Sequence, residues 1–526
     1  MDNMMLPSIG RRSFLRGVAA ASVVPAVCPT DVADVGEVKL RFGALSDIHI
    51  TTSAQQPYFE KALRQLDAWK ADAVLACGDL ADLGLKQQLA LLAETWFKVF
   101  PGGKGSDGRP VANLMHYGDH DMANFYVDNA GAKGLVPDDA LRHASVIFNG
   151  DRKAIWEECF KEPWEPIAVK TVKGFPFVLY HFSRGTPDNP WGQNVPGLKE
   201  VLEKLEFDPK KPLFFSQHRI PKNTAGGEYT YGQDDGDTTR LFAKYPNLVA
   251  FCGHCHLSAS EERSIWQGSF TCVQVPSLRY CTTLGGRENS YSITDRPPIP
   301  PYQMLPQHKG SGTTHQGLFC VVGTKALSIR RWDFEEGKSL GPDWVVPLSS
   351  FAQKASARPF APANRAKALH PVEFDKKAKV TVAFTKGVDR DKNKHDFFTV
   401  SFPPAVKGLE RANDYEVTLE LKKGDVERCL VAKRVFSPRY LYGVESETEP
   451  VICNFAAEEV PQGWLLRFVV RPVTSFNMKG DPIATPWEFR AWGKDSKTAT
   501  AIAKNMTSRS AARKWQALRD KTNTPK

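Results

Sequence analysis

The chain has 526 residues, 42% of them hydrophobic, so it is too long for one ordinary domain and has ample material for packed cores. Its net charge of +10 lies mostly at the ends: residues 497–526 hold eight Lys or Arg against one acid, and residues 1–26 hold three Arg against one Asp. The body between them is close to neutral, which argues against a nucleic-acid-binding groove. Ten cysteines in a chain of this length do not indicate a disulfide scaffold.

The N-terminus has the organisation of an export signal. Arg11-Arg12-Ser13-Phe14-Leu15-Arg16 precedes an apolar run from Gly17 to Val27, which is too short to span a bilayer as a mature helix. This arrangement resembles the twin-arginine signal of bacteria. We therefore predict that residues 1–30 are a signal peptide that directs export to the periplasm or cell envelope. A disordered basic segment that contains two arginines by chance is the alternative.

Residues 38–345 show the alternation of helices and strands expected of an α/β domain. Apolar positions at helical spacing predict helices over 59–69, 83–100, 140–160, 201–205 and 238–245. Turn residues between apolar runs predict hairpins over 167–182, 264–275 and 318–332. A stretch rich in Pro, Gly, Ser and Thr, 284–316, is predicted to be a long loop, and such loops are usually functional or disordered.

Five short apolar runs in this region each end on Asp or His. Ionisable side chains directly after a buried strand are costly to desolvate, and a divalent metal is the obvious partner for them. Open α/β sheets place their sites at this end of their strands, so the five endings are expected to meet. They are Asp47-Ile48-His49, Gly78-Asp79, Gly118-Asp119-His120-Asp121, His218 and Gly253-His254-Cys255-His256.

In this order the motifs resemble the calcineurin-like metallophosphoesterase superfamily, whose pattern is Asp-x-His, Gly-Asp, Gly-Asn-His-Asp/Glu, a lone His and Gly-His-x-His. The resemblance covers Lys39 to Asp333 and implies a four-layer αββα domain that holds two metal ions. It implies that Asp79 bridges the two ions. It assigns Asp47, His49 and His256 to the first metal and Asp119, His218 and His254 to the second.

Carboxylates and imidazoles suit Mn, Fe or Zn. A bridging carboxylate lets two ions sit about 3.5–4 Å apart, where they clamp the attacking and leaving oxygens of phosphoryl transfer and supply hydroxide at neutral pH. The resemblance implies that His120 stabilises or protonates the departing alkoxide, with Asp121 orienting its ring. Asp119 departs from the family's Asn. Its extra negative charge is expected to tighten cation binding and to reduce the Lewis acidity of the second metal.

Several other residues are weaker candidates. Arg219, Asn124 and Arg279 are placed where they could contact substrate phosphate, with a structural role as the alternative for each. The remaining histidines fit no position of the motifs, and we predict that they are structural or loop residues. They are His116, His181, His308 and His315.

Beyond the predicted α/β domain the sequence changes character. The Pro, Ala and Ser content of residues 346–370 predicts a linker. Strict alternation in Tyr415/Val417/Leu419/Leu421 and neighbouring runs predicts a smaller all-β sandwich over residues 371–495. The basic tail, residues 496–526, is predicted to be a solvated extension. Contact of this tail with an anionic envelope surface is the alternative.

Together these features predict an exported, metal-dependent phosphoric ester hydrolase whose substrate is a phosphate ester. A phosphodiesterase is favoured, because Asp follows His120 and His stands in the Asp47-Ile48-His49 motif. A phosphomonoesterase or nucleotidase is one alternative. A non-catalytic envelope-binding protein, in which the β-sandwich does the binding, is another. The identity of the substrate does not follow from the sequence.

Overall fold

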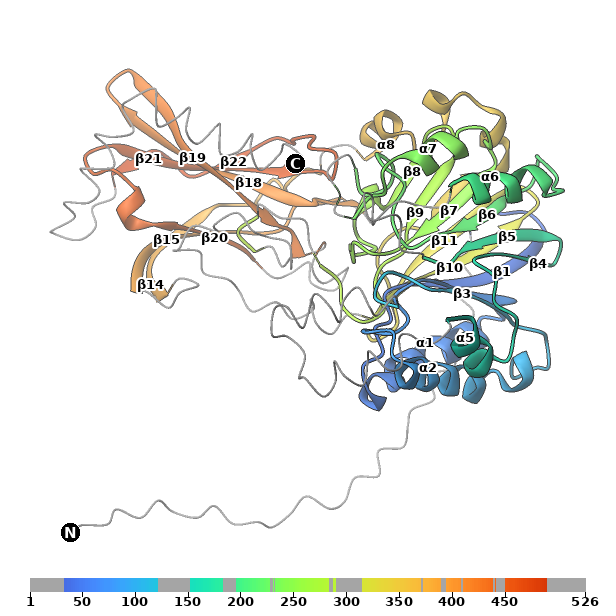
Figure 1. The fold of residues 1–526 in the computed structure, drawn as a ribbon. Helices are drawn as coiled ribbons and strands as arrows, with labels where there is room; N and C mark the ends of the chain where they lie inside the picture. The colour runs from blue at the N-terminus through green and yellow to red at the C-terminus, as the bar shows by residue number, and fades with distance from the viewer. Residues whose placement is uncertain are drawn as a thin grey trace, which may run out of the picture.

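The protein is described here from a computed structural model covering residues 33–121, 152–182, 195–227, 230, 232–282, 287–289, 315–369, 372–388, 394–407, 410–438, 440 and 450–489. The predicted signal peptide, the basic tail, Asn124 and His308 lie outside these residues. Figure 1 shows a larger lobe of helices and sheets beside a smaller lobe of strands. Within the described residues, no helix has the length and apolar character needed to cross a bilayer.

Two sheets form the centre of the larger lobe. The first has strand order β12-β11-β10-β1-β2-β3, with β13 also paired to β11, and the second has order β4-β5-β6-β7-β9-β8. The first consists of β1 (Val38–Leu45), β2 (Ala73–Cys77), β3 (Ala112–His116), β10 (Gln316–Gly323), β11 (Ala326–Asp333), β12 (Lys338–Ser339) and β13 (Trp344–Pro347). The second consists of β4 (Ile167–Val172), β5 (Phe175–Tyr180), β6 (Leu213–Ser216), β7 (Leu248–Cys252), β8 (Ile265–Gln267) and β9 (Thr271–Gln274). The predicted hairpins correspond to β4–β5, β8–β9 and β10–β11.

Helices cover the outer face of each sheet, as Figure 1 shows. On one side lie α1 (Gln56–Ala68), α2 (Lys86–Val99) and α5 (Arg152–Phe160), and on the other lie α6 (Val195–Lys204), α7 (Asp237–Phe242) and α8 (Pro362–Ala368). The sheets pack face to face through a buried apolar layer in which the Phe42 ring meets three rings of the second sheet edge-on, at 5.1–5.6 Å. The predicted four-layer αββα fold is confirmed. Of the helix predicted over 140–160, the structure describes only α5.

The prediction that residues 346–370 form a linker is wrong for the part that the structure describes. After β13 the chain continues through the 3₁₀ turns Leu348–Ala352 and Ala355–Ala357 into α8. Phe351 and Phe360 are buried in the layer between the two sheets, and Arg365 forms an ion pair with Glu262. Two aromatic anchors and one ion pair hold this segment on the domain, and a Pro/Ala/Ser-rich composition does not reveal them.

The smaller lobe is all-β, as predicted. A three-stranded sheet of β14 (Thr381–Val388), β15 (Lys394–Phe402) and β20 (Val451–Ala456) faces a sheet of β18 (Asp414–Lys423), β19 (Val426–Phe436), β21 (Leu465–Val473), β22 (Ile483–Ala484) and β23 (Glu488–Phe489). The short strands β16 (Val406–Lys407) and β17 (Glu410–Arg411) pair with each other. The alternating residues Tyr415, Val417, Leu419 and Leu421 all point into the core between the sheets.

Candidate metal centre

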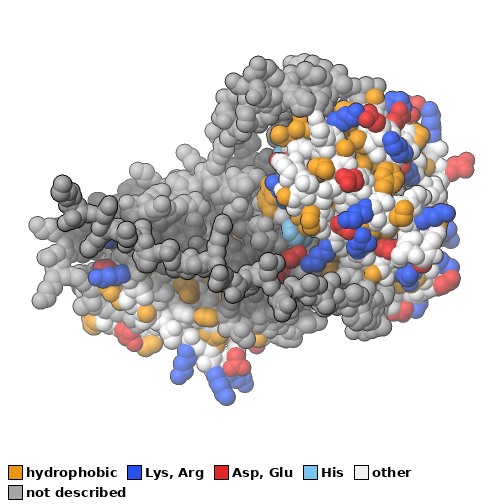
Figure 2. Space-filling model, turned by 90° about the horizontal axis from the view of Figure 1, so that it is seen from below, with side chains coloured by type: hydrophobic (Ala, Val, Ile, Leu, Met, Phe, Trp, Pro, Cys, Tyr) orange, Lys and Arg blue, Asp and Glu red, His pale blue; other side chains and the backbone are white. Residues whose placement is uncertain are grey.

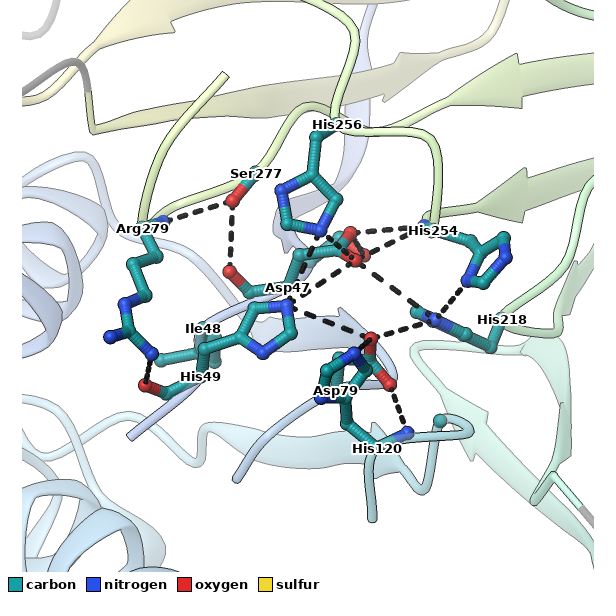
Figure 3. A network of polar contacts seen from close by, with 12 residues as sticks. Asp47, Ile48, His49, Asp79, His120, His218, His254, His256, Ser277 and Arg279 are labelled. Carbon is teal, nitrogen blue, oxygen red and sulfur yellow. Dashed lines mark hydrogen bonds and ion pairs between the residues drawn. The ribbon is translucent and has the colours of Figure 1, made fainter. Parts of the chain in front are cut away.

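The five predicted strand endings meet at one place in the larger lobe, between the carboxyl ends of β1, β2 and β3 and those of β6 and β7 (Figure 3). All seven predicted ligands lie there in two groups that share Asp79. Within each group the ligand atoms lie within 4.8 Å of one another. The groups are Asp47, His49, Asp79 and His256, and Asp79, Asp119, His218 and His254.

Short contacts join imidazoles and carboxylates across the centre. His256 Nε2 lies 2.9 Å from Asp47 Oδ1. His218 Nε2 lies 3.1 Å from Asp79 Oδ2 and 3.0 Å from Asp119 Oδ1. The carboxylates of these three aspartates are almost completely buried. Negative charge at this depth needs compensation, which partner imidazoles or cations can provide.

Hydrogen bonds to the outer nitrogens determine which way the imidazole lone pairs point. His218 Nδ1 lies 2.7 Å from the Cys77 carbonyl oxygen, and His256 Nδ1 lies 3.1 Å from the Tyr280 carbonyl oxygen. Since a carbonyl oxygen can only accept, each Nδ1 carries the proton and donates it. In the neutral ring Nε2 then presents a lone pair towards the centre. Outer hydrogen bonds of this kind are what orient metal-binding histidines.

The donor set itself fits a metal. His49 Nε2 and His256 Nε2 face each other at 3.3 Å, and His254 Nδ1 and His218 Nε2 face each other at 3.2 Å. His49 Nδ1 and His256 Nδ1 are hydrogen-bonded outwards, to Asp82 and to the Tyr280 carbonyl oxygen, so two Nε2 lone pairs face each other and need a cation or proton between them. The His254–His218 pair can instead form an N–H···N hydrogen bond. Four imidazoles and three carboxylates are also the ligand types that first-row transition metals prefer. The residues present therefore match the two ions that the family resemblance implies.

The ionisation of the aspartates reflects burial and neighbouring charge. Burial raises the pKa of Asp79 to about 7, with the Asp119 carboxylate adding to the rise against the opposing effect of His218. Burial works in the same direction on Asp119, but His254 and His218 hold its pKa well below the usual range. Asp79 is thus the group whose negative charge is least compensated by the protein, and it lies where the two ligand groups meet.

Five of the seven predicted ligands have left-handed backbone conformations, which non-glycine residues rarely adopt. Their φ angles are +50° at Asp47, +47° at His49, +52° at Asp79, +73° at His254 and +53° at His256. Hydrogen bonds between the strand ends hold the turns, including His49 N–H to the Asp79 carbonyl at 2.9 Å. Such strain costs stability and clusters at functional sites. The turns aim the side chains into the space between the sheets.

Glycine is required beside two of the ligands. A Cβ atom at Gly118 would lie 2.2 Å from both the backbone nitrogen and Oδ1 of Asp79. A Cβ atom at Gly78, whose φ is +88°, would lie 2.6 Å from His218 Nδ1. The glycines of the Gly-Asp and Gly-Asp-His-Asp motifs therefore let the strand ends approach each other closely.

His120 lies beside the predicted ligands at the edge of the candidate centre. Its backbone N–H donates to Asp79 Oδ1 at 2.9 Å, its Nδ1 lies 2.7 Å from the Asp82 carbonyl oxygen, and its Nε2 lies 4.0 Å from Asp79 Oδ2. The side chain is 27% exposed, whereas that of His218 is fully buried. Burial opposes protonation of His120, but the Asp79 and Asp119 carboxylates raise its pKa.

The prediction that Asp121 orients the His120 ring needs correction. Asp121 accepts hydrogen bonds from the backbone N–H groups of Leu80, Ala81 and Gly118, at 2.7–3.0 Å. It thereby ties the loop after β2 to the loop after β3. The hydrogen bond at His120 Nδ1 goes to the Asp82 carbonyl oxygen instead. Neighbouring side chains in a turn point in different directions, which adjacency in the sequence does not reveal.

Asp82 is a further candidate site residue, which none of the sequence motifs marks. Its Oδ1 lies 3.1 Å from His49 Nδ1, and it forms a third group of possible metal ligands with His49 and His120. Arg279 reaches the same carboxylate at 3.1 Å and donates to the His49 carbonyl oxygen at 2.8 Å. The signal for Asp82 was its spacing of three residues from Asp79, after the strand that delivers Asp79.

The other candidates have separate places. Arg279 is held by protein acceptors, and Arg219 is half-buried on the loop after β6, close enough to His254 to affect its pKa. His116 Nε2 lies 2.7 Å from Ser216 Oγ between the sheets, and His315 Nδ1 lies 2.7 Å from the Leu278 carbonyl oxygen. His181 accepts from Tyr117 N–H and Trp164 Nε1, both at 3.1 Å.

Comparison with known proteins gives one family and one curated relative. Residues 40–258 match the family model described as calcineurin-like phosphoesterase. The relative is UDP-2,3-diacylglucosamine pyrophosphatase LpxG of Chlamydia muridarum. It is 22% identical over 275 residues, which are 47% of this chain and 78% of the relative.

Solved structures with partial similarity include a dimetal phosphatase from Danio rerio, with 10% identity and a TM-score of 0.34 over 59% of this chain and 100% of that one. A purple acid phosphatase from yellow lupin (Lupinus luteus) has 13% identity and a TM-score of 0.35, over 58% of this chain and 53% of that one. Residues 40–258 contain all five motifs, from Asp47 to His256. The chain contains a calcineurin-like phosphoesterase domain and is a metal-dependent phosphoester hydrolase.

Proposed function

We propose that this chain is an exported phosphoesterase with a dinuclear metal centre that acts on linkages of the phosphodiester type. The observation that carries the proposal is the pair of ligand groups sharing Asp79, with the partly exposed His120 beside them. In this proposal Asp79 would be a ligand of both ions. Asp47, His49 and His256 would hold one ion, and Asp119, His218 and His254 would hold the other.

Bound transition-metal ions would supply Lewis acidity towards phosphoryl oxygens and activate water at neutral pH. The chain's own residues orient the ligands and donate a proton to the leaving group. Because His120 Nδ1 donates to the Asp82 carbonyl oxygen, its ring is fixed with Nε2 on the side of the centre. We assign to Nε2 the proton that passes to the departing oxygen of the ester.

The charge of the centre supports a diester-type substrate. Asp119 adds a third carboxylate where the family pattern has a neutral Asn. A monoester phosphate carries two negative charges near neutral pH, whereas a diester-type phosphorus carries one, so the extra carboxylate disfavours the monoester more. The relative LpxG is by its name a pyrophosphatase, and each phosphorus of an internal pyrophosphate is also of this singly charged type.

The test compares two substrates with the same leaving group, bis(p-nitrophenyl) phosphate and p-nitrophenyl phosphate, on protein loaded with Mn, Fe or Zn. We expect a higher kcat/KM for the diester. Faster turnover of the monoester would overturn the diester preference and favour a phosphomonoesterase. If the protein retains two ions but hydrolyses neither compound nor a pyrophosphate diester, the proposed activity is wrong.

Export is the second part of the proposal, and it rests on Arg11-Arg12 followed by the apolar run from Gly17 to Val27. Fractionation of bacterial cells should place the wild-type chain in the periplasm or envelope, and the double variant Arg11→Lys/Arg12→Lys in the cytoplasm. Equal distribution of the two chains would remove the twin-arginine signal from the proposal. An envelope location without hydrolysis would favour a non-catalytic binding protein.

The face shown in Figure 2 bears on partners. Basic and acidic side chains are interspersed over the described part of the larger lobe there, and no single-sign region dominates the described surface in this view. A nucleic-acid groove would need a continuous basic stripe. We propose that the partner is a phosphate-ester substrate.

A further inference from the structure

Two described stretches, 277–282 and 287–289, follow β9 and are here called the strap; the first of them lies beside the metal centre. The first end of the strap contacts the backbone of two proposed ligands. Ser277 Oγ donates to the Asp47 carbonyl oxygen at 3.0 Å, and Thr282 N–H donates to the His256 carbonyl oxygen at 2.7 Å. Figure 3 shows Ser277 and Arg279 beside Asp47 and His49.

The same end also fixes a ligand side chain. The Tyr280 carbonyl oxygen accepts from His256 Nδ1 at 3.1 Å, and the Tyr280 ring lies 4.4 Å from the His256 ring. Leu278 N–H donates to the Ser46 carbonyl oxygen at 2.9 Å, next to Asp47. The position of the strap therefore sets the orientation of the His256 imidazole and the direction of its Nε2 lone pair.

The second end of the strap is bound by the β-sandwich. Glu288 N–H donates to the Arg434 carbonyl oxygen at 2.7 Å. The Asn289 side chain accepts from Phe436 N–H at 2.7 Å and donates to the Phe436 carbonyl oxygen at 3.2 Å. Both partners belong to β19, which is the edge strand of its sheet. The strap thus takes up hydrogen-bonding groups that an edge strand leaves open.

A buried ion pair anchors this end. Arg287 Nε donates to Asp414 Oδ2 at 2.8 Å, and Arg434 Nη2 donates to the same oxygen at 2.6 Å. Asp414 is fully buried, and the Arg287 side chain is 16% exposed. One guanidinium comes from the strap and the other from β19, so Asp414 joins the two lobes. Removing the carboxylate would leave two largely buried cations without their shared partner.

The distance along the chain between the two ends is short. Only residues 283–286 separate Thr282 from Arg287, so the ends are joined by five Cα–Cα steps of about 3.8 Å each. A displacement that would carry Arg287 beyond the reach of these five steps must move Thr282 as well. The contacts of Thr282 and Tyr280 would pass that displacement to His256.

We propose that Asp414 is a positioning residue of the metal centre, which acts through Arg287 and the strap on the His256 ligand. The β-sandwich is then part of the hydrolytic unit and not an appended binding module. The effect on turnover rests on the proposed function. The effect on the strap and on metal retention does not.

The test uses the full chain and compares Asp414→Ala with Leu419→Ala. Leu419 lies on the same strand, is fully buried in the sandwich core and makes no strap contact in the described residues. Both changes weaken the sandwich, but only the first removes the carboxylate with which Arg287 pairs. The first measurement is hydrogen exchange of the metal-free protein over residues 277–282. We expect roughly tenfold faster exchange in Asp414→Ala and wild-type exchange in Leu419→Ala.

The second measurement is the number of Zn ions retained after dialysis against a weak chelator. Asp414→Ala should lose about one of two ions, whereas Leu419→Ala should keep both. If Asp414→Ala does not fold, Arg287→Gln breaks the same pair from the strap side and should give the same result. Unchanged exchange at 277–282 in whichever of these two variants folds would overturn the proposal, and so would equal effects in Leu419→Ala. Hydrolytic inactivity of a wild-type protein that shows the expected exchange would count only against the proposed function.

Discussion

Replacing Asp119 by Asn should change which phosphate esters the enzyme prefers. The substitution restores the residue of the family pattern and removes one negative charge without changing the shape of the side chain. Asp119 Oδ1 lies 3.0 Å from His218 Nε2 and 3.4 Å from His254 Nδ1, inside the second ligand group. Every substrate phosphate that approaches the centre must therefore approach this carboxylate.

The size of the effect follows from Coulomb's law. The ligand atoms of the group lie within 4.8 Å of one another, and we take the separation between Asp119 and a bound phosphoryl group as comparable. At an effective dielectric constant of about 20, one extra unit of charge at that separation costs about 3 kcal/mol, or roughly a hundredfold in kcat/KM. Salt and solvent reduce this figure, so a tenfold to hundredfold change is expected.

The assay is the ratio of kcat/KM for p-nitrophenyl phosphate to that for bis(p-nitrophenyl) phosphate, at one ionic strength and saturating metal. We expect the ratio to rise in Asp119→Asn, with metal affinity reduced and activity on the diester retained or raised. Asp67→Asn is the matched control, because it neutralises an aspartate of α1 that pairs with Arg109, away from the centre. An unchanged ratio in Asp119→Asn, or an equal rise in the control, would refute the electrostatic reasoning.

Three further predictions concern the bridge, the proton donor and the fold. Asp79→Asn should lose both metals together and His49→Ala mainly one, as measured by elemental analysis. His120→Ala should keep both metals but lose about 10²–10⁴-fold in turnover of esters with poor leaving groups, and less for a nitrophenyl diester; loss of metal would contradict this role. Burial opposes the ionisation of Glu262, yet Arg331 and Arg365 lower its pKa from 4.5 to about 2. This shift corresponds to about 3 kcal/mol of folding free energy. The contribution is fully present above the pKa of the unfolded chain and is lost as the pH falls towards 2. Urea unfolding should therefore show Glu262→Gln less stable than the wild type at pH 7, with the difference shrinking at pH 3.

The grouping of the candidate ligands was predictable because it follows a rule of topology. Parallel strands deliver their following residues to one edge, so Asp47, Asp79 and Asp119 could be expected together after β1, β2 and β3. The structure also brings His218 and His254 to them from the second sheet. Predicting that these histidines join the aspartates required the order of the motifs along the chain, because hydrophobic periodicity does not show how two sheets pack against each other.

The groups that orient the histidines of the site were not predictable in the same way. His218, His256 and His120 are each fixed by a backbone carbonyl oxygen, from Cys77, Tyr280 and Asp82. Every residue has such an oxygen, so the identity of the side chain carries no signal. The role expected of Asp121 was wrong for the same reason. The His120 ring is oriented by the backbone carbonyl oxygen of Asp82, which no motif marks.

The linker prediction failed for a related reason. Composition reports an average over residues 346–370, whereas the position of that segment depends on a few anchors. Phe351 and Phe360 supply buried apolar area, and Arg365 reaches Glu262, which also pairs with Arg331 at 2.8 Å. A stretch with low hydrophobic content can therefore be firmly packed when its few large side chains face a core.

The carboxylates and imidazoles of the centre come mostly from different sheets, so the geometry of the centre depends on how the two sheets pack. The three carboxylates come from loops after β1, β2 and β3, and three of the four imidazoles come from loops after β6 and β7. A buried cluster of carboxylates on one sheet alone would be strongly unfavourable, and the imidazoles that the second sheet brings to about 3 Å reduce this cost. Packing of the two sheets therefore completes the set of candidate ligands. The strap extends that dependence to the β-sandwich, because the residue that orients His256 is joined through Arg287 to the buried carboxylate of Asp414.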